Sequence, residues 1–372
     1  MEKSKVFFTN LRTTYGVSLL DKFERLIKTA GIEQIDFKKK FTAIKIHFGE
    51  PGNLAYIRHH YVKRLSNIIQ YLGGIPFMTD SNTLYSGKRA NALDHINSAL
   101  ENGFTPISTG CNIIIADGIK GTDYKKIPVN ATHIKNAKIA TAIADSDILI
   151  SMNHFKGHEL SGFGGALKNL GMGSGSRAGK KEMHSCSKPK ISAKKCTGCG
   201  MCIKNCSQNA ISLADNSKAV IDYDHCIGCG QCIVVCQYKA AQLNWDESFE
   251  VLNEKIAEYA FAAIKDKPSF HINFAVDISP DCDCYGHNDL PIIPDIGIFA
   301  SFDPVALDKA CADMAINAPV MNNSLADEKS NSKSGKGIDK FEVVHPGTCW
   351  LSGLKHCQNL GVGNLEYEIV KI

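Results

Sequence analysis

The sequence contains no run of eighteen consecutive apolar residues, so it offers no candidate for a membrane-spanning helix. It also lacks a strong excess of one charge, since 42 Lys and Arg residues face 38 Asp and Glu residues, for a formal net charge of +4. Because no basic stripe with interleaved aromatic residues occurs either, we expect neither nucleic-acid binding nor membrane insertion. The first residues lack the apolar core of a secretory signal, and we therefore expect a cytoplasmic protein.

The residue type in clear excess is cysteine. The chain holds 15 cysteines in 372 residues, whereas its 44% apolar and 22% charged residues are ordinary for a globular protein of two or three domains. Disulfide bonds rarely persist in a reducing cytoplasm. The excess therefore favours metal ligation over disulfide bonding.

Eight of these cysteines lie between positions 196 and 236, in two runs that share the spacing Cys-x2-Cys-x2-Cys-x3-Cys. The first run comprises Cys196, Cys199, Cys202 and Cys206, and the second comprises Cys226, Cys229, Cys232 and Cys236. Glycines between the cysteines, such as Gly198 and Gly200, allow the tight turns that a chain needs to wrap a cluster. Two zinc ribbons are the alternative, but zinc ribbons use isolated Cys-x2-Cys pairs, which fit this repeat poorly.

The repeated spacing resembles that of bacterial two-cluster ferredoxins, in which the first three cysteines of one run and the fourth cysteine of the other hold each [4Fe–4S] cluster. The resemblance implies two [4Fe–4S] clusters in this chain. Their ligands would be Cys196, Cys199, Cys202 and Cys236 for the first cluster, and Cys226, Cys229, Cys232 and Cys206 for the second. The proline that usually follows the fourth cysteine is absent, since Ser207 and Gln237 stand there, which removes a rigid turn but no ligand. Between the two runs, apolar residues on both sides of 215–217 predict a small hairpin.

On both sides of this segment, short apolar runs alternate with stretches of helical periodicity. The expected strands are Val6–Thr9, Ala43–His47, Ile75–Thr79, Ile113–Ala116, Asp147–Ser151, His271–Asp277, Ile296–Phe299 and Glu366–Val370. The expected helices include Val17–Ala30, Leu54–Leu72, Lys88–Asn102, Glu250–Ile264 and Pro304–Ile316. This alternation predicts an α/β fold, with a mostly parallel sheet and helices on both faces. Residues 1–186 and 247–372 would form this host domain, and residues 187–246 an inserted α+β two-cluster ferredoxin domain.

In open α/β sheets, ligands bind beyond the carboxyl ends of the strands. The strand at 147–151 is followed by His154, Lys156 and His158, and then by a glycine-rich turn into a helix that holds Lys168. Cationic side chains beside a helix N-terminus suit an anion such as a carboxylate or phosphate. A solvated basic turn is the alternative. The nearby segment 173–181 is similar to a phosphate-binding loop, but Ser174 and Lys181 replace residues that such a loop needs, so we exclude an ATPase.

A second cluster of functional side chains follows the strand at 271–277. Cys282, Cys284 and His287 lie within six residues of one another and form a possible extra site for a metal or a substrate. The alternative is that the two cysteines are buried thiols in a turn, because a free cysteine often acts as a small apolar residue.

The host segments resemble the family catalogued as domain of unknown function 362, whose forms with an internal ferredoxin module are labelled uncharacterised iron–sulfur centre proteins. The segments that carry this resemblance are HFGEPGN (47–53), TDSNTLYSGKRANALDH (79–95), IADGIKG (115–121), HFKGHELSGFGGALKNLGMG (154–173), SPDCDC (279–284) and DLPIIPDIGIFASFDPVALD (289–308). The spacing from His158 to Lys168 is also similar to that in nickel-pincer lactate racemases. There a histidine acts as acid and base, and a lysine ten residues later carries the cofactor. Ala166 replaces a glycine of that pattern, and we predict no nickel pincer, but the similarity implies that His158 and Lys168 face one pocket.

Together these features favour an oxidoreductase. Two clusters would relay electrons between an external donor or redox partner protein and an anionic small molecule held by the host. His154 or His158 would donate a proton, and Lys156 and Lys168 would hold the anion. One alternative is a non-catalytic electron carrier whose host domain is a docking platform. The other is a metal or cluster delivery protein that uses Cys282, Cys284 and His287.

Overall fold

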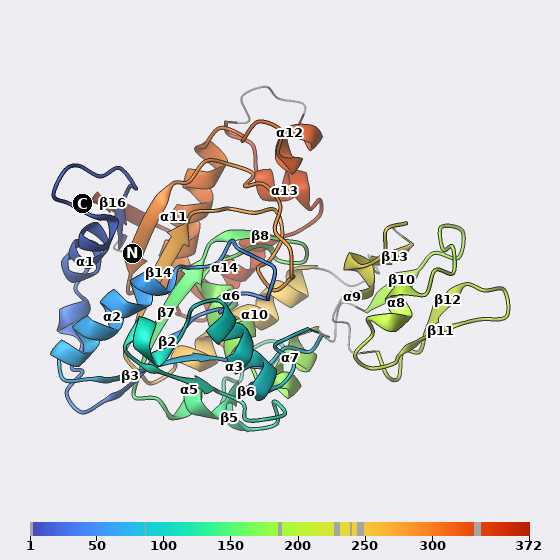
Figure 1. Ribbon diagram of the computed structural model, residues 1–372, viewed down its shortest axis with the longest axis horizontal. Coiled ribbons are helices and arrows are strands. Elements are labelled where there is room, and N and C mark those ends of the chain that lie inside the picture. Colours follow the sequence, from blue (N-terminus) through green and yellow to red (C-terminus); the bar gives the residue numbers. More distant parts are fainter. Residues whose placement is uncertain are drawn as a thin grey trace.

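The computed structural model describes residues 3–85, 87–184, 188–226, 231–238, 240–243, 249–330 and 336–372. Its centre is an eight-stranded sheet in the order β16-β1-β15-β14-β7-β2-β3-β4 (Figure 1). These strands are β1 (Ser4–Thr9), β2 (Phe41–Lys45), β3 (Ile75–Asp80), β4 (Asn112–Ile115), β7 (Ile148–His154), β14 (Ser269–Ala275), β15 (Gly297–Ser301) and β16 (Tyr367–Lys371). Neighbouring strands are parallel except around β15, which is antiparallel to β1 and β14. The predicted mostly parallel sheet is confirmed, and all eight expected strands belong to it.

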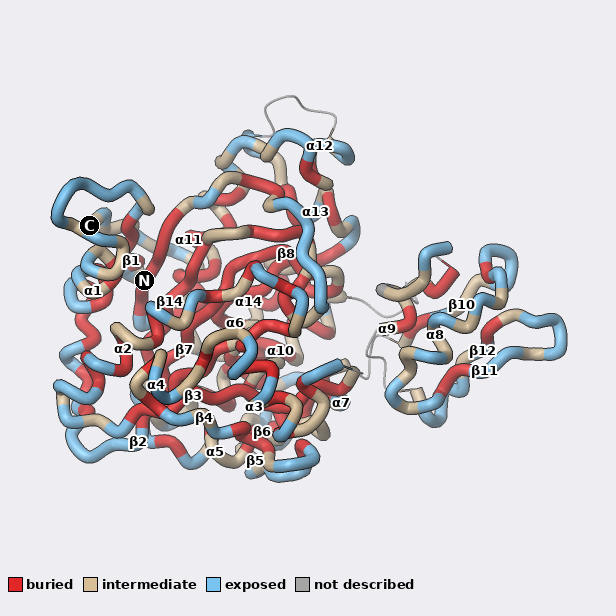
Figure 2. The backbone as a smooth tube through the Cα atoms, in the orientation of Figure 1, coloured by how far each residue is buried: buried red, intermediate tan, exposed pale blue. Residues whose placement is uncertain are grey.

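Each face of the sheet packs on its own hydrophobic core. Successive residues of a strand point to opposite faces, so in β7 Leu149 enters one core while Ile148 and Ile150 enter the other. The first core is closed by α6 (Ala166–Ser174), α10 (Phe249–Ile264), α11 (Pro304–Asn317) and α14 (Trp350–Asn359). The second is closed by α1 (Leu19–Thr29), α2 (His59–Tyr71) and α3 (Ala92–Glu101). The expectation of helices on both faces is therefore confirmed, and Figure 2 shows the central strands β7 and β14 buried between the layers.

The helices α1, α2 and α3 begin later than expected, and polar residues cap α1 and α3, whereas α11 begins at the expected Pro304. Ser18 caps α1 and forms a capping box with Asp21, and Asn91 caps α3. Asp303 accepts hydrogen bonds from the backbone N–H groups of Val305 and Ala306 and so caps α11, as expected for an Asp-Pro helix start. None of the helices in the described ranges has the length and apolarity that crossing a bilayer requires.

The cysteine-rich segment lies beside the α/β layers (Figure 1). It contains β10 (Pro189–Ile191), α8 (Met201–Lys204), β11 (Ile211–Leu213), β12 (Ala219–Ile221), α9 (Gln231–Val234) and β13 (Ala241–Leu243). The antiparallel pair β11–β12 is the predicted hairpin, and β10 pairs with β13 to close the segment. The expected domain boundaries fall in residues 185–187 and 244–248, outside the described part of the chain, so these boundaries and the inserted ferredoxin domain stay predictions.

The remaining elements connect these layers. They are η1 (Ile32–Gln34), α4 (Pro106–Thr109), β5 (Tyr124–Pro128), β6 (Asn136–Ala140), α5 (Thr141–Asp145), β8 (Lys156–His158), β9 (Gly162–Gly164), α7 (Arg177–His184), α12 (Leu325–Lys329) and α13 (Lys340–Val344). The segment similar to a phosphate-binding loop belongs to the end of α6 and the start of α7. A phosphate-binding loop joins a strand to a helix, so this segment also differs from one in its structural context.

Candidate active site at the strand ends

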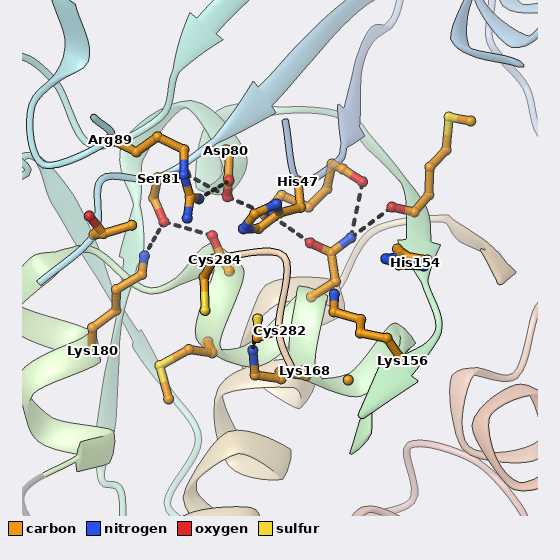
Figure 3. Close-up of a pocket in the computed structure, with 18 of the residues that line it drawn as sticks. His47, Asp80, Ser81, Arg89, His154, Lys156, Lys168, Lys180, Cys282 and Cys284 are labelled. Atoms are coloured by element: carbon orange, nitrogen blue, oxygen red, sulfur yellow. Dashed lines mark hydrogen bonds and ion pairs between the residues drawn. The ribbon is translucent and has the colours of Figure 1, made fainter. Parts of the chain in front are cut away.

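The carboxyl ends of β2, β3 and β7 open into one pocket of about 560 Å³, which includes its mouth to solvent (Figure 3). The loop that follows β14 and the first turn of α6 complete its wall. Charged and sulfur-containing side chains dominate the lining, among them Lys45, His47, Asp80, Arg89, His154, Lys156, Lys168, Lys180, Cys282 and Cys284. The pocket therefore lies where ligands bind in open α/β sheets.

The sheet face that packs against α6 changes from apolar to polar residues along its strands. Ala43 and Leu149 belong to the hydrophobic core, but the same face continues with Lys45 in β2 and Asn153 in β7. Asn169 of α6 donates hydrogen bonds to the Lys45 carbonyl at 3.2 Å and to Asn153 Oδ1 at 2.7 Å. The polar strand ends are thus held together by a helix side chain, and this arrangement forms the floor of the pocket.

Five cationic side chains surround the pocket, but carboxylates neutralise three of them. Lys45 Nζ lies 2.8 Å from Asp80 Oδ1, and Arg89 Nε lies 2.8 Å from Glu50 Oε2. The third pair joins Lys156 Nζ to Asp283 Oδ1 at 2.6 Å.

The other two cations are Lys168 and Lys180. Lys168 Nζ donates to Cys282 Sγ at 3.4 Å, and Lys180 donates to the Ser81 hydroxyl and to the Gly175 carbonyl. Within the described residues, no carboxylate oxygen lies within 4 Å of either nitrogen. Lys168 faces the Cys282 sulfur, whereas the partners of Lys180 are a hydroxyl and a carbonyl, so Lys180 in particular is available to an anion.

Asp283 contacts three basic groups, two of which, His154 and Lys156, the sequence placed near the pocket. It contacts Lys156, His154 Nδ1 at 3.2 Å and His47 Nδ1 at 3.7 Å. Burial alone would raise the pKa of Asp283, but Lys156 and the two histidines hold this pKa well below its usual value. His154 Nε2 faces the Val276 carbonyl at 2.8 Å. Both ring nitrogens of His154 therefore already face acceptors, and His154 and Lys156 anchor the loop after β14 within the pocket wall.

His158 and Lys168, the pair expected to share a pocket, meet at Cys282. The backbone N–H groups of Leu160 and Ser161 each donate to His158 Nδ1 at 3.1 Å, so the ring carries its proton on Nε2. His158 lies near enough to the Cys282 sulfur to contribute to the lowered pKa of that thiol. It lines an adjoining pocket of about 580 Å³ whose wall shares Lys168 with the first pocket. The structure thus brings His158, Lys168 and Cys282 together.

The two cysteines of the loop after β14 interact with each other. Gly157 allows this loop to approach β8, because a Cβ atom at position 157 would lie 2.0 Å from the Pro280 carbonyl oxygen. A hydrogen bond from the Cys284 thiol holds the pKa of Cys282 well below its usual value, and Lys168 and Lys156 contribute to this lowering. The same hydrogen bond, followed by burial, raises the pKa of Cys284. The pKa of Cys282 is thus lowered and that of Cys284 raised, which makes Cys282 the more acidic thiol of the pair.

The extra metal site expected at Cys282, Cys284 and His287 does not assemble. His287 is exposed and stacks on Tyr285, with ring centroids 5.7 Å apart, while the two cysteines face the pocket. The described residues contain no group of three or more His, Cys, Asp or Glu side chains arranged to hold a metal ion.

The amino terminus of α6 is not free to bind an anion, contrary to the expectation from the sequence. The Asp308 carboxylate, from α11, accepts hydrogen bonds from the Ala166 N–H at 2.7 Å and the Leu167 N–H at 2.9 Å. A Cβ atom at Gly165 would lie 2.3 Å from Asp308 Oδ1, so glycine is needed for this close approach. Lysine side chains, and not the helix terminus, therefore provide the positive charge in the pocket.

The cysteine-rich segment brings together the four residues assigned to the first cluster. Cys196, Cys199, Cys202 and Cys236 all line one cavity of about 350 Å³. A backbone N–H of Ala219 donates to Cys196 Sγ at 3.4 Å and lowers the pKa of Cys196, and the Ala240 N–H donates to Cys236 Sγ at 3.2 Å. Such N–H···S bonds are typical of cluster ligands, and the binding of a cluster by these four cysteines stays a prediction.

The second expected ligand set is described only in part. Cys206, Cys226 and Cys232 belong to the described residues and form no disulfide there, and the Ala210 N–H donates to Cys206 Sγ at 3.3 Å. Cys229 lies outside the described residues, so the assembly of this set stays a prediction.

Residues 42–313 match the family described as Domain of unknown function (DUF362), which is nearly three quarters of the chain. The chain belongs to the DUF362 family. The resemblance carried by the host segments is therefore confirmed. None of the curated proteins matches this chain.

Two solved structures are similar to this DUF362 protein in part. The lactate racemase apoprotein from Thermoanaerobacterium thermosaccharolyticum is 11% identical with a TM-score of 0.38, over 85% of this chain and 58% of that protein. A protein from Thermotoga maritima is 12% identical with a TM-score of 0.38, over 79% of this chain and 57% of that protein. The DUF362 chain thus spans less than three fifths of either protein.

Sequence analysis of the DUF362 chain missed three cations of the pocket: Lys45, Arg89 and Lys180. Lys45 ends β2, two residues before the expected end of that strand, so the same rule that pointed to His154 would have found it. Lys180 lies in the segment that was dismissed as a phosphate-binding loop. Arg89 lies between β3 and α3 and pairs with Glu50 and Asp80 at the pocket. No local sequence pattern marks it.

Proposed function

We propose that this protein is an iron–sulfur oxidoreductase in which two [4Fe–4S] clusters relay electrons to or from an anionic substrate in the strand-end pocket. The observation that carries the proposal is a contact between the two parts of the chain. The Ser207 hydroxyl donates a hydrogen bond to the Leu84 carbonyl at 2.8 Å. Ser207 follows the expected cluster ligand Cys206, and Leu84 precedes Tyr85, which lines the pocket.

The cluster ligands would be the two interleaved sets of cysteines, with Cys196, Cys199, Cys202 and Cys236 around the cavity described above. When bound, each cluster accepts or donates a single electron. Cys199 is exposed, which favours this side of the segment as the surface for an external electron donor or redox partner protein.

In the pocket, Lys168 and Lys180 would bind the anionic group of the substrate, since neither is paired with a carboxylate in the described residues. His158 Nε2 carries a proton and would hydrogen-bond groups at Cys282. Asp283 would keep the loop after β14 in place through Lys156 and His154. The pocket therefore places lysine ammonium groups, the His158 N–H group and the Cys282 sulfur near one another.

The pocket also favours an oxidoreductase over an electron carrier that only docks a partner. A docking platform needs a complementary surface, but it has no need of a cavity lined by buried cations. Lys180 is buried and has no carboxylate oxygen within 4 Å among the described residues, and burying such a charge is costly unless a ligand uses it.

Anaerobic purification tests the proposal directly. The expected preparation is brown, absorbs at about 400 nm and contains about eight irons per chain. Oxidation of the reduced protein by small anionic acceptors is expected to be slower in Lys168→Met and Lys180→Gln, which leave every cluster cysteine intact. Lys355→Met, which removes an exposed lysine of α14, is the matched control. A colourless protein that holds zinc would contradict the proposal.

A further inference from the structure

Cys282 and Cys284 are the most reactive groups of the pocket that the proposed function leaves without a role. Both thiols line the pocket, and Figure 3 shows them beside Lys168. Lys168 Nζ lies 3.4 Å from Cys282 Sγ. Cys282 is buried and Cys284 half-buried, and both are accessible to a small molecule that enters the pocket. Two adjacent thiols beside a cation are suited to thiol–disulfide exchange.

We propose that Cys282 and Cys284 form a redox-active dithiol that is oxidised to a disulfide, and that the substrate is a small disulfide carrying anionic groups. The proposal rests on the proposed function, because the clusters would supply the electrons that restore the dithiol. It assigns the chemical class of the substrate and the residues that react with it.

The exchange balances in atoms and charge. The Cys282 thiolate attacks one sulfur of the substrate, which forms a mixed disulfide, breaks the substrate S–S bond and releases one substrate thiolate. Cys284 then attacks the Cys282 sulfur, which forms the Cys282–Cys284 disulfide and releases the second substrate thiol with the proton from Cys284. Two electrons from the reduced clusters and one proton from solvent return the pair to thiolate and thiol.

The pocket supports this class of substrate in three ways. Both thiols line a pocket at the strand ends and not the outer surface, which favours a small disulfide over a disulfide on a folded protein. Lys168 and Lys180 match anionic groups. A disulfide needs two electrons, which corresponds to one from each of two clusters.

Oxidised glutathione is a suitable probe, since it is a small disulfide with several carboxylates. The full-length holoprotein is reduced anaerobically, desalted, mixed with the probe, alkylated and digested with trypsin. The tryptic peptide 266–309 contains Cys282 and Cys284 and no other cysteine. This peptide is expected to be doubly alkylated before the probe is added and disulfide-bonded afterwards. The neutral 2-hydroxyethyl disulfide is expected to react about tenfold more slowly, because it lacks the charges that the lysines attract.

Variants separate the two roles of the pair. Cys284→Ser is expected to accumulate a mixed disulfide between Cys282 and glutathione, because no second thiol remains to displace it. Cys282→Ser is expected to form neither product. Cys349→Ser, which removes an exposed cysteine outside the pocket, is expected to behave as the wild type.

The inference is overturned if the peptide stays doubly alkylated in the presence of oxidised glutathione. It is also overturned if Cys282→Ser loses a zinc or iron ion that the wild type binds in addition to its clusters. Cluster absorbance is recorded in the same samples, and exchange with oxidised glutathione does not depend on it. A protein without clusters therefore contradicts the proposed function alone, and a clustered protein without exchange contradicts this inference alone.

Discussion

Among single residues, Lys168 has the strongest influence on the chemistry of the pocket. Burial alone would lower its pKa, but the neighbouring sulfurs of Cys282 and Cys284 and the carboxylates of Glu159 and Asp283 raise it, so the ammonium group stays charged at neutral pH. In turn, this charge stabilises the Cys282 thiolate.

Lys168→Met is therefore expected to raise the pKa of Cys282, so that the rise of its alkylation rate with pH moves to higher pH by about one unit. Lys168→Arg is expected to keep the wild-type rate to within a few-fold. The measurement is the pH profile of iodoacetamide labelling in peptide 266–309. Equal profiles for Lys168→Met and the wild type would show that the lysine has no electrostatic role.

Lys180 predicts a pH dependence of anion binding. Burial lowers the pKa of Lys180 to about 8, so its ammonium form is populated below this pH and is lost as the pH rises through it. Sulfate keeps its charge across this range, so its affinity is expected to fall between about pH 7 and pH 9. Calorimetric titration is the measurement. In Lys180→Gln the affinity is expected to be low throughout, and in Lys180→Arg it is expected not to fall in this window.

At the scale of elements, α6 depends on a carboxylate from a distant helix. Asp308 satisfies the first N–H groups of α6 and also accepts from Asn273 Nδ2 at 2.7 Å. It thereby joins α6, α11 and β14, and α6 presents Lys168 and Asn169 to the pocket.

Asp308→Ala is expected to lower the free energy of unfolding by about 2 to 4 kcal/mol, because it leaves several buried donors without an acceptor. Asp303→Ala removes the half-buried cap of α11 and is expected to cost about 1 to 2 kcal/mol. Urea unfolding of both variants tests this order. A larger loss for Asp303→Ala would contradict the role assigned to Asp308.

The same residue predicts how stability changes with pH. Burial raises the pKa of Asp308 to about 6, whereas an unfolded aspartate titrates near about 4. Between these values the folded state retains a proton that the unfolded state has lost, so the contribution of Asp308 to stability decreases as the pH rises. Relative to Asp308→Asn, the wild type is therefore expected to lose stability as the pH rises from about 4 to about 6. Urea unfolding at several pH values is the measurement.

At the scale of the whole molecule, the cysteine-rich segment contacts the host through Ser207 and Leu84. Ser207 stands where bacterial ferredoxins have a proline, and a proline has no hydroxyl group to donate this bond. Ser207, which replaces the first proline of the ferredoxin pattern, thus also connects the segment to the pocket rim.

Ser207→Ala is expected to weaken this docking by about 1 kcal/mol, the usual net contribution of one hydrogen bond. Hydrogen–deuterium exchange is expected to increase by about fivefold near Leu84 and in residues 203–210, with unchanged cluster absorbance. Ser212→Ala, on the exposed strand β11, is the control. Unchanged exchange near Leu84 would show that the bond does not hold the two parts together.

The cysteine-rich segment is also expected to need its clusters in order to fold. Its hydrophobic core contains few residues, and cysteines such as Cys196 and Cys232 are part of that core. Removal of iron from the full chain by a chelator is expected to make residues 188–243 sensitive to limited proteolysis while the host resists. Equal resistance of this segment with and without iron would contradict the expectation.

Local sequence pattern was sufficient for the eight strands of the sheet, the main helices and the cap at Asp303, because the period of apolar residues and the capping chemistry act within a few neighbours. The spacing of the cysteines was sufficient to propose which four belong together, and Cys236 does line the cavity of the first run. The pattern failed at the amino terminus of α6, because Asp308 lies 142 residues along the chain from Ala166.

The pocket was decided by tertiary structure. Local pattern placed His154, Lys156 and Lys168 near one strand end. It did not show that Asp283 pairs with His154 and Lys156, or that Lys168 faces Cys282. Lys45, Arg89 and Lys180 come from separate elements that only the sheet order brings to one edge. Periodicity and spacing reflect forces between sequence neighbours, whereas charge pairing in a buried pocket depends on which distant segments the folded chain brings within a few ångströms.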